Sequence, residues 1–164
     1  MHNDNDTIAA RHPDYVDYQV EFDLISALKS GSQAMRDAGE LYLPKFSKEQ
    51  QAPYDRRKNS SYLHPGFSDA IEKQTSKPFS RPIAVEGELD KKMAYITDDV
   101  DGRGTTITTL AKQAFAMAAS YRRVLLFTDY SIVNLASGAS KSDEVASRAS
   151  IFNISDKDFF NWKY

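Results

Sequence analysis

The fold of this chain is decided by residues 101–127, DGRGTTITTLAKQAFAMAASYRRVLLF. Its opening aspartate and glycines are typical of a turn, and Thr105 or Thr106 can cap a following helix. Apolar residues then recur on one helical face: Ile107, Leu110, Ala111, Ala114, Phe115 and Ala118. We expect this helix to end near Tyr121 and to lead into Val124-Leu125-Leu126-Phe127, an apolar run typical of a strand buried on both faces.

Helical periodicity also marks the sequence before this stretch. An apolar stripe with fourfold spacing predicts a helix over about 15–28; its members are Val16, Val20, Leu24 and Leu28, with Ile25 beside them. Gly31 should interrupt the helix, and a second helical segment from Ser32 should stop at Gly39.

Prolines and polar residues divide the middle of the chain. Residues 46–53 are polar and flanked by prolines, which predicts a surface loop. A short helical stripe at Phe67, Ala70 and Ile71 precedes a linker over about 79–90.

The C-terminal part combines a polar excursion with apolar segments. Residues 131–147 are rich in Ser, Ala and Gly, which favours a mobile excursion, and 150–154 partly alternate like a strand. The aromatic cluster at 159–164, which includes Trp162, favours packing against later sequence or another chain. We therefore expect an α+β fold, helix-dominated with a few short strands and incomplete without later sequence. A flexible tail at 1–13 precedes one region at 14–164.

Composition excludes several function classes. The 164 residues suit one domain with one core, and a net charge of −2 with a pI of about 5.9 disfavours electrostatic DNA binding. The absence of cysteine excludes disulfides and thiol chemistry. No secretory signal and no apolar run long enough to span a membrane is evident.

The segment Asp101–Thr106 is the one place that suggests nucleotide binding, because glycines before a helix can present N–H groups to a phosphate. It lacks the Gly-Lys-Ser/Thr ending of a P-loop, so a turn with a threonine cap is the favoured interpretation. The nearby Asp98, Asp99 and Asp101 do not follow the calcium-loop spacing and favour a solvated acidic turn.

Other candidate sites are weaker still. His2, His12 and His64 show no metal-ligand spacing, and no serine lies in a Gly-x-Ser-x-Gly motif. Arg56, Arg57 and Lys58 could face nucleic acid, but a solvated helix face is the more ordinary interpretation. We therefore assign no catalytic, cofactor-binding or metal-binding residue and expect no enzyme and no cofactor.

Several short stretches, in serial order, resemble the N-terminal part of a tailed-bacteriophage portal (head-to-tail connector) protein. They are Ala34–Glu40 with Tyr42-Leu43-Pro44, Tyr54–Tyr62, Lys77-Pro78, Asp99–Thr106, Tyr121–Tyr130 and Asn161–Tyr164. The strongest are Asp99–Thr106 and Tyr121–Tyr130, which flank the alanine-rich helix. Residues 136–147 look longer and more polar than that family's pattern.

The resemblance implies a structural role in the virion. In that plan the chain is assembled in the host cytoplasm into a dodecameric ring at the capsid portal vertex, through which DNA is packaged and ejected. It contributes the outer, wing-type region; its partners are other copies of itself, the major capsid protein or scaffold, and the head-to-tail adaptor. Terminase would bind segments absent here, and DNA would pass without sequence-specific binding, with no membrane involved. The alternatives are a small adaptor module, which would bind a partner through the aromatic C-terminus, and a nucleotide-binding domain using Asp101–Thr106.

Overall fold

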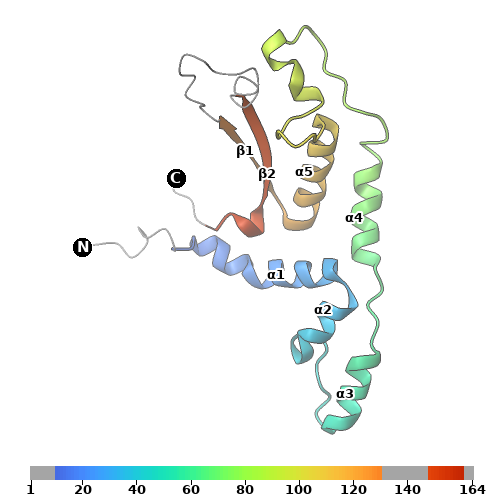
Figure 1. Ribbon diagram of the computed structural model, residues 1–164. Coiled ribbons are helices and arrows are strands. Elements are labelled where there is room, and N and C mark those ends of the chain that lie inside the picture. Colours follow the sequence, from blue (N-terminus) through green and yellow to red (C-terminus); the bar gives the residue numbers. More distant parts are fainter. Residues whose placement is uncertain (1–9, 131–147, 161–164) are drawn as a thin grey trace, which may run out of the picture. The chain divides into compact units, whose positions relative to one another are not determined.

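The computed structural model describes residues 10–130 and 148–160 and is a helix-dominated α+β structure, which confirms the expected fold class (Figure 1). The chain divides into two compact units, where its length favoured one core. Unit 1 contains residues 1–73 and 160–164, and unit 2 contains residues 74–159. Of the expected tail at 1–13, residues 1–9 lie outside the described part, and the first helix begins at Pro13.

Unit 1 begins with two helices joined at a glycine. The first, α1 (Pro13–Ser30), has Pro at its start and is capped by His12, whose Nδ1 accepts from the Asp14 N–H at 3.2 Å. Gly31 takes a φ of 85°, which separates α1 from α2 (Ser32–Asp37). The predicted helices at 15–28 and 32–38 and the break between them are therefore confirmed.

The apolar stripe that predicted α1 is partly exposed in the structure. Val16 and Val20 are 52% and 71% exposed, whereas Phe22 is 3% exposed. The rings of Tyr15 and Tyr18 lie 5.9 and 6.4 Å from that of Phe22. Aromatic rings carry more apolar area than valine side chains, so this second stripe, at 15, 18 and 22, faces the interior instead.

Two further helices follow in the sequence. These are α3 (Gln51–Ser60) and α4 (Gly66–Ser76), with a 3-10 helix at Gly39–Leu41 preceding them. The loop predicted at 46–53 is shorter than expected, because Pro53 lies in the first turn of α3. A proline is tolerated there, since the first N–H groups of a helix have no partner within it. The helix predicted around Phe67–Ile71 is confirmed.

Unit 2 packs one long helix against a two-stranded sheet. Its elements are 3-10 helices at Lys91–Thr97 and Asp156–Asp158, helix α5 (Ile107–Tyr121), and strands β1 (Val124–Tyr130) and β2 (Ala149–Ser155). The strands are antiparallel, in an unbroken register from Val124 opposite Ser155 to Tyr130 opposite Ala149. Thr106 caps α5 by accepting from the Thr109 N–H at 3.2 Å. The predicted helix, its cap and the second strand are confirmed.

The expectation of a central strand buried on both faces is wrong. β1 belongs to a two-stranded sheet, and its Leu126 and Phe127 are 62% and 51% exposed. An apolar run shows what a strand could bury, but burial on both faces needs covering layers and neighbouring strands. The described residues supply only β2 as a neighbour and α5 on one face. The excursion expected at 131–147 lies outside the described residues.

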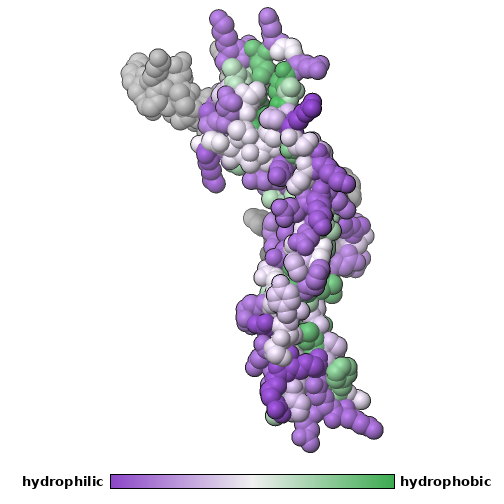
Figure 2. Space-filling model, turned by 90° about the vertical axis from the view of Figure 1, so that its right-hand side faces the viewer, coloured by the Kyte–Doolittle hydropathy of each residue, from purple (hydrophilic) through white to green (hydrophobic). Residues whose placement is uncertain are grey.

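The two units bury few large side chains. In the part of the chain that the structure describes, the buried hydrophobic residues are Phe22, Tyr54, Val100, Leu110 and Tyr121. Many large apolar side chains are exposed instead, and apolar patches are visible at the surface among polar residues (Figure 2). No helix among the described residues combines the length and apolarity that crossing a membrane requires.

Candidate functional site

The Asp101–Thr106 segment forms a turn closed by its own side chains. One carboxylate oxygen of Asp101 accepts from the N–H groups of Arg103 at 2.9 Å and Thr105 at 3.2 Å, and the other accepts from the Thr105 hydroxyl at 2.7 Å. The Thr105 hydroxyl, followed by the backbone donors, holds the pKa of Asp101 below its usual value despite partial desolvation. Gly102 and Gly104 take φ values of 79° and 85°, which only glycine adopts readily.

Asp99 ties this turn to the start of β2. Its carboxylate accepts from the Gly104 N–H at 2.7 Å and forms an ion pair with Arg148. The Arg148 guanidinium, followed by the Gly104 N–H, lowers the pKa of Asp99. Arg148 also lies 4.8 Å from the ring centroid of Tyr95, whose hydroxyl donates to the Ala149 carbonyl at 2.9 Å. The acidic turn thus connects the start of α5 to the start of β2 within unit 2.

This geometry favours the turn interpretation over phosphate binding. The N–H groups of Arg103, Gly104 and Thr105, which an anion would need, already donate to Asp99 and Asp101. Because both carboxylates have lowered pKa values, a phosphate would also meet two negative charges.

The acidic and histidine candidates that the structure describes do not gather into a metal site. Among the described residues, no group of three or more His, Asp or Glu side chains is placed to hold a metal ion. His12 caps α1, His64 is exposed beside Gly66, and His2 lies outside the described residues.

The basic segment of α3 is partly structural. The Arg57 guanidinium binds Glu49 at 2.8 Å, donates to the Pro44 carbonyl at 2.9 Å and lies 4.7 Å from the ring centroid of Phe46. Hydrogen bonding to Arg57 lowers the pKa of Glu49. Arg57 therefore fastens the 44–50 loop to α3, whereas Arg56 is exposed.

The aromatic C-terminus is described only in part. Phe160 is 42% exposed, its carbonyl accepts from the His12 N–H at 2.8 Å, and its ring lies edge-on to Tyr15 at 6.5 Å. Trp162 and the rest of 161–164 lie outside the described residues.

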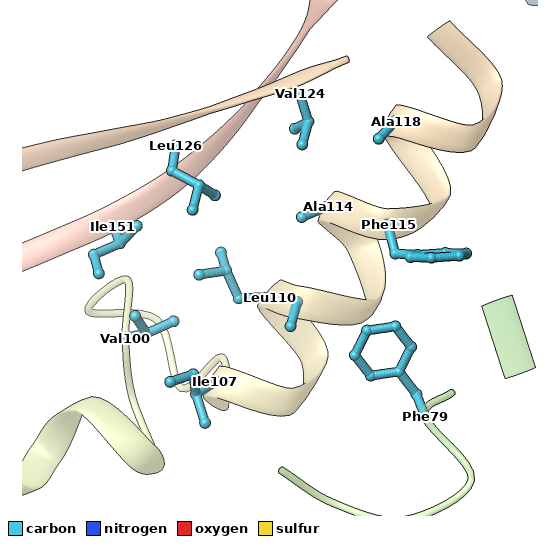
Figure 3. Close-up of a pocket in the computed structure, with 11 residues that line it drawn as sticks. Phe79, Val100, Ile107, Leu110, Ala114, Phe115, Ala118, Val124, Leu126 and Ile151 are labelled. Carbon is cyan, nitrogen blue, oxygen red and sulfur yellow. The ribbon is translucent and has the colours of Figure 1, made fainter. Parts of the chain in front are cut away.

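An apolar groove runs between α5 and the sheet in unit 2 and has a volume of about 420 Å³ (Figure 3). Every residue of the α5 apolar face lines it: Ile107, Leu110, Ala111, Ala114, Phe115 and Ala118. Val124, Leu126 and Ile151 line the sheet side. The groove holds no polar side chain suited to chemistry, so it can bury an apolar partner but offers no reactive group.

Two groove residues were missed by sequence reasoning. Phe79 lies in the predicted linker, yet its ring packs edge-on against Phe115 at 5.9 Å. Val100 is 1% exposed and accepts from the Ile151 N–H at 2.9 Å through its carbonyl. Lone apolar residues beside proline or aspartate carry no periodic signal, so only the tertiary structure brings them to α5.

No protein-family model and no curated protein matches this chain.

Proposed function

We propose that this chain is a structural subunit of a tailed-bacteriophage portal, contributing the outer, wing-type region of a ring at the capsid vertex. The proposal rests first on the serial order of the resembling stretches. They fall on successive elements: α2 and the turn after it, α3, the residues after α4, the Asp99–Thr106 turn, and β1.

The observation that carries the proposal is the balance of buried and exposed apolar side chains. Among the described residues, five hydrophobic ones are buried and fifteen large ones are exposed, Val20, Leu41 and Leu126 by more than 60%. Contiguous exposed apolar surface is typical of chains completed by neighbours. A subunit packed among other copies, capsid protein and adaptor proteins would cover such surface.

The candidate site also suits a structural part. The one glycine-rich turn is occupied by its own carboxylates and joins α5 to the strands, so it acts as a joint. In the proposal the ring is a conduit for DNA packaging and ejection, and this region supports it from outside the tunnel.

The test is a mass measurement combined with electron microscopy on the longest reading frame that contains this sequence. We expect rings, dodecameric in the plan that the resemblance implies. Monomers at every concentration would overturn the proposal and leave the adaptor module as the better hypothesis.

A matched pair of variants makes this test specific. Val20→Asp places a charge on an exposed apolar face of α1 and should reduce ring yield while the helical circular dichroism is kept. Asp17→Ala, on the same helix, should leave ring yield unchanged. Equal ring yield from Val20→Asp and the parent would show that this face is not buried in the ring.

The absence of enzymatic activity is tested separately. Calorimetric titration with ATP, GTP and dinucleotides, with and without magnesium, should give no binding heat. Heat that Gly102→Val abolishes would support the nucleotide-binding hypothesis instead.

A further inference from the structure

Over residues 124–128, the outer edge of β1 has no neighbouring strand among the described residues. The sheet has the order β1–β2, and the far edge of β2 is engaged: the Ile151 N–H donates to the Val100 carbonyl, and the Ala149 carbonyl accepts from the Tyr95 hydroxyl, both at 2.9 Å.

These two contacts also show which backbone groups of β1 point outward. In an antiparallel ladder, alternate residues direct both their N–H and C=O groups to opposite sides. Ile151 points away from β1 and lies opposite Thr128, so Thr128 points away from β2. By the same alternation, Val124 and Leu126 also point outward. Within the described chain, these three residues make no backbone hydrogen bond outside the ladder.

The edge lacks most of the features that usually prevent strand pairing, and the one charged residue of β1 is Asp129. Residues 124–128 contain no proline and no charge, and the register with β2 has no bulge. Leu126 and Phe127 are more than half exposed. An apolar edge with an unbroken register is a template for another strand.

The strand is complementary to itself. Antiparallel pairing centred on Leu126 places Val124 opposite Thr128 of the second copy, so the three outward-pointing residues of each strand meet each other. The same register places Leu125 opposite Phe127 and Arg123 opposite Asp129 at both ends. Shifting this pairing by one residue would place inward-pointing backbone groups opposite outward-pointing ones. Shifting it by two residues would move Arg123 away from Asp129 of the second copy. We infer that β1 pairs with β1 of a second copy of this chain, about a two-fold axis at Leu126, to form a four-stranded sheet.

The side chains on both faces suit this pairing. Val124 and Leu126 point to the α5 side, so the two Leu126 side chains meet beside the apolar groove and extend it (Figure 3). Arg123, the residue before β1, forms an ion pair with Asp156, and its side chain is 46% exposed. A guanidinium carries five N–H donors, so it can bind Asp156 and the Asp129 of the second copy together.

The inference is independent of the portal proposal. A two-fold contact is self-complementary and joins two copies, whereas a ring is built from head-to-tail contacts. Dimers of this chain and rings of a longer chain are therefore separate measurements, and either can fail alone.

Sedimentation across a dilution series of the 164-residue chain tests dimer formation, and single cysteines test the register. The chain has no cysteine, so each introduced thiol is the only one. With mild oxidant, Leu126→Cys should cross-link to itself, because directly opposed Cα atoms lie about 5.5 Å apart. Thr128→Cys alone should not cross-link, whereas a mixture of Val124→Cys and Thr128→Cys should. A monomer at all concentrations, or equal cross-linking at 126 and 128, would overturn the inference.

A proline variant tests the edge without a thiol. Leu126→Pro removes an outward N–H and leaves the ladder with β2 intact, so circular dichroism should be unchanged. The dimer dissociation constant should rise roughly tenfold or more, since the N–H is lost from both copies. An unchanged dissociation constant in the folded variant would show that the copies meet elsewhere.

Discussion

In unit 2, the ion pair of Arg148 with Asp99 joins residues 49 positions apart, and the hydrogen bond from Tyr95 to Ala149 spans 54. In unit 1, Arg57 binds Glu49 only 8 positions away, and Arg36 reaches Ser61 across 25. Unit 1 also has longer-range contacts: the Leu63 N–H donates to the Ser32 hydroxyl across 31 positions, and the His12 N–H donates to the Phe160 carbonyl.

The difference concerns cooperativity. A contact between distant residues must offset a larger loss of chain entropy, so the long-range contacts of unit 2 depend on one another. Local contacts in unit 1 can form and break separately. We therefore expect hydrogen exchange to show unit 2 opening as one body and the loops of unit 1 opening individually.

The largest expected effect comes from removing apolar volume in unit 2. Leu110 is 8% exposed between α5 and the sheet, so Leu110→Ala should lower the free energy of unfolding of unit 2 by about 2–4 kcal/mol. Urea titration followed by hydrogen exchange measures the change. Leu41→Ala, at a position 71% exposed in unit 1, is the control and should alter stability by less than about 0.5 kcal/mol. Equal losses would contradict the contrast between the units.

Asp101→Ala should lower the free energy of unfolding of unit 2 less than Leu110→Ala does. It leaves two N–H groups and the Thr105 hydroxyl without their acceptor. Protection of β2 amides should fall together with that of the turn, since the turn is joined to Arg148 through Asp99. Asp101→Asn keeps one amide oxygen acceptor, so its stability should lie between that of the parent and that of Asp101→Ala. Asp98→Ala, at an exposed neighbour, should match the parent; a turn that opens while β2 stays protected would refute the coupling.

Acid should lower the free energy of unfolding of unit 2 less than Asp101→Ala does, because a protonated carboxyl group keeps its oxygen acceptors. The pKa values of Asp99 and Asp101 lie below the ordinary 3.8 in the folded chain. As the pH falls, these carboxylates therefore take up protons in the unfolded chain before they do so in the folded chain. The stability that they contribute is fully present above the ordinary pKa of 3.8 and is lost as the pH falls from that value through the folded pKa values. Urea midpoints between about pH 6 and pH 3 measure the loss. Asp99→Asn should flatten the slope, and an identical slope in that variant would rule out Asp99 as a cause.

The smallest effect is expected at Arg57 in unit 1. Arg57→Lys loses the paired donation to Glu49 and the contact with the Phe46 ring. Exchange should quicken in the 44–50 loop alone, with the global unfolding midpoint unchanged. Arg56→Lys is the matched control on the same turn, and faster exchange throughout unit 1 would show that Arg57 does more than hold this loop.

The sequence predicted the helical elements well because their signals are local. Thr106 caps α5, Gly31 separates α1 from α2, and the α5 apolar face lines the groove as its spacing indicated. The exposed stripe on α1 and the exposure of β1 were not predictable in this way. Periodicity identifies faces that could be buried, but which face is covered depends on partners elsewhere in the chain.

The candidate site divides in the same manner. Turn and cap at Asp101–Thr106 follow from residue types over six positions, and composition alone disfavoured nucleic-acid and thiol chemistry. Only the tertiary structure decided three other features: the ion pair between Asp99 and Arg148, the burial of Val100 and the outward-facing edge of β1. Backbone propensities and caps act within a few residues, whereas ion pairs and strand edges depend on which distant segments the fold brings together.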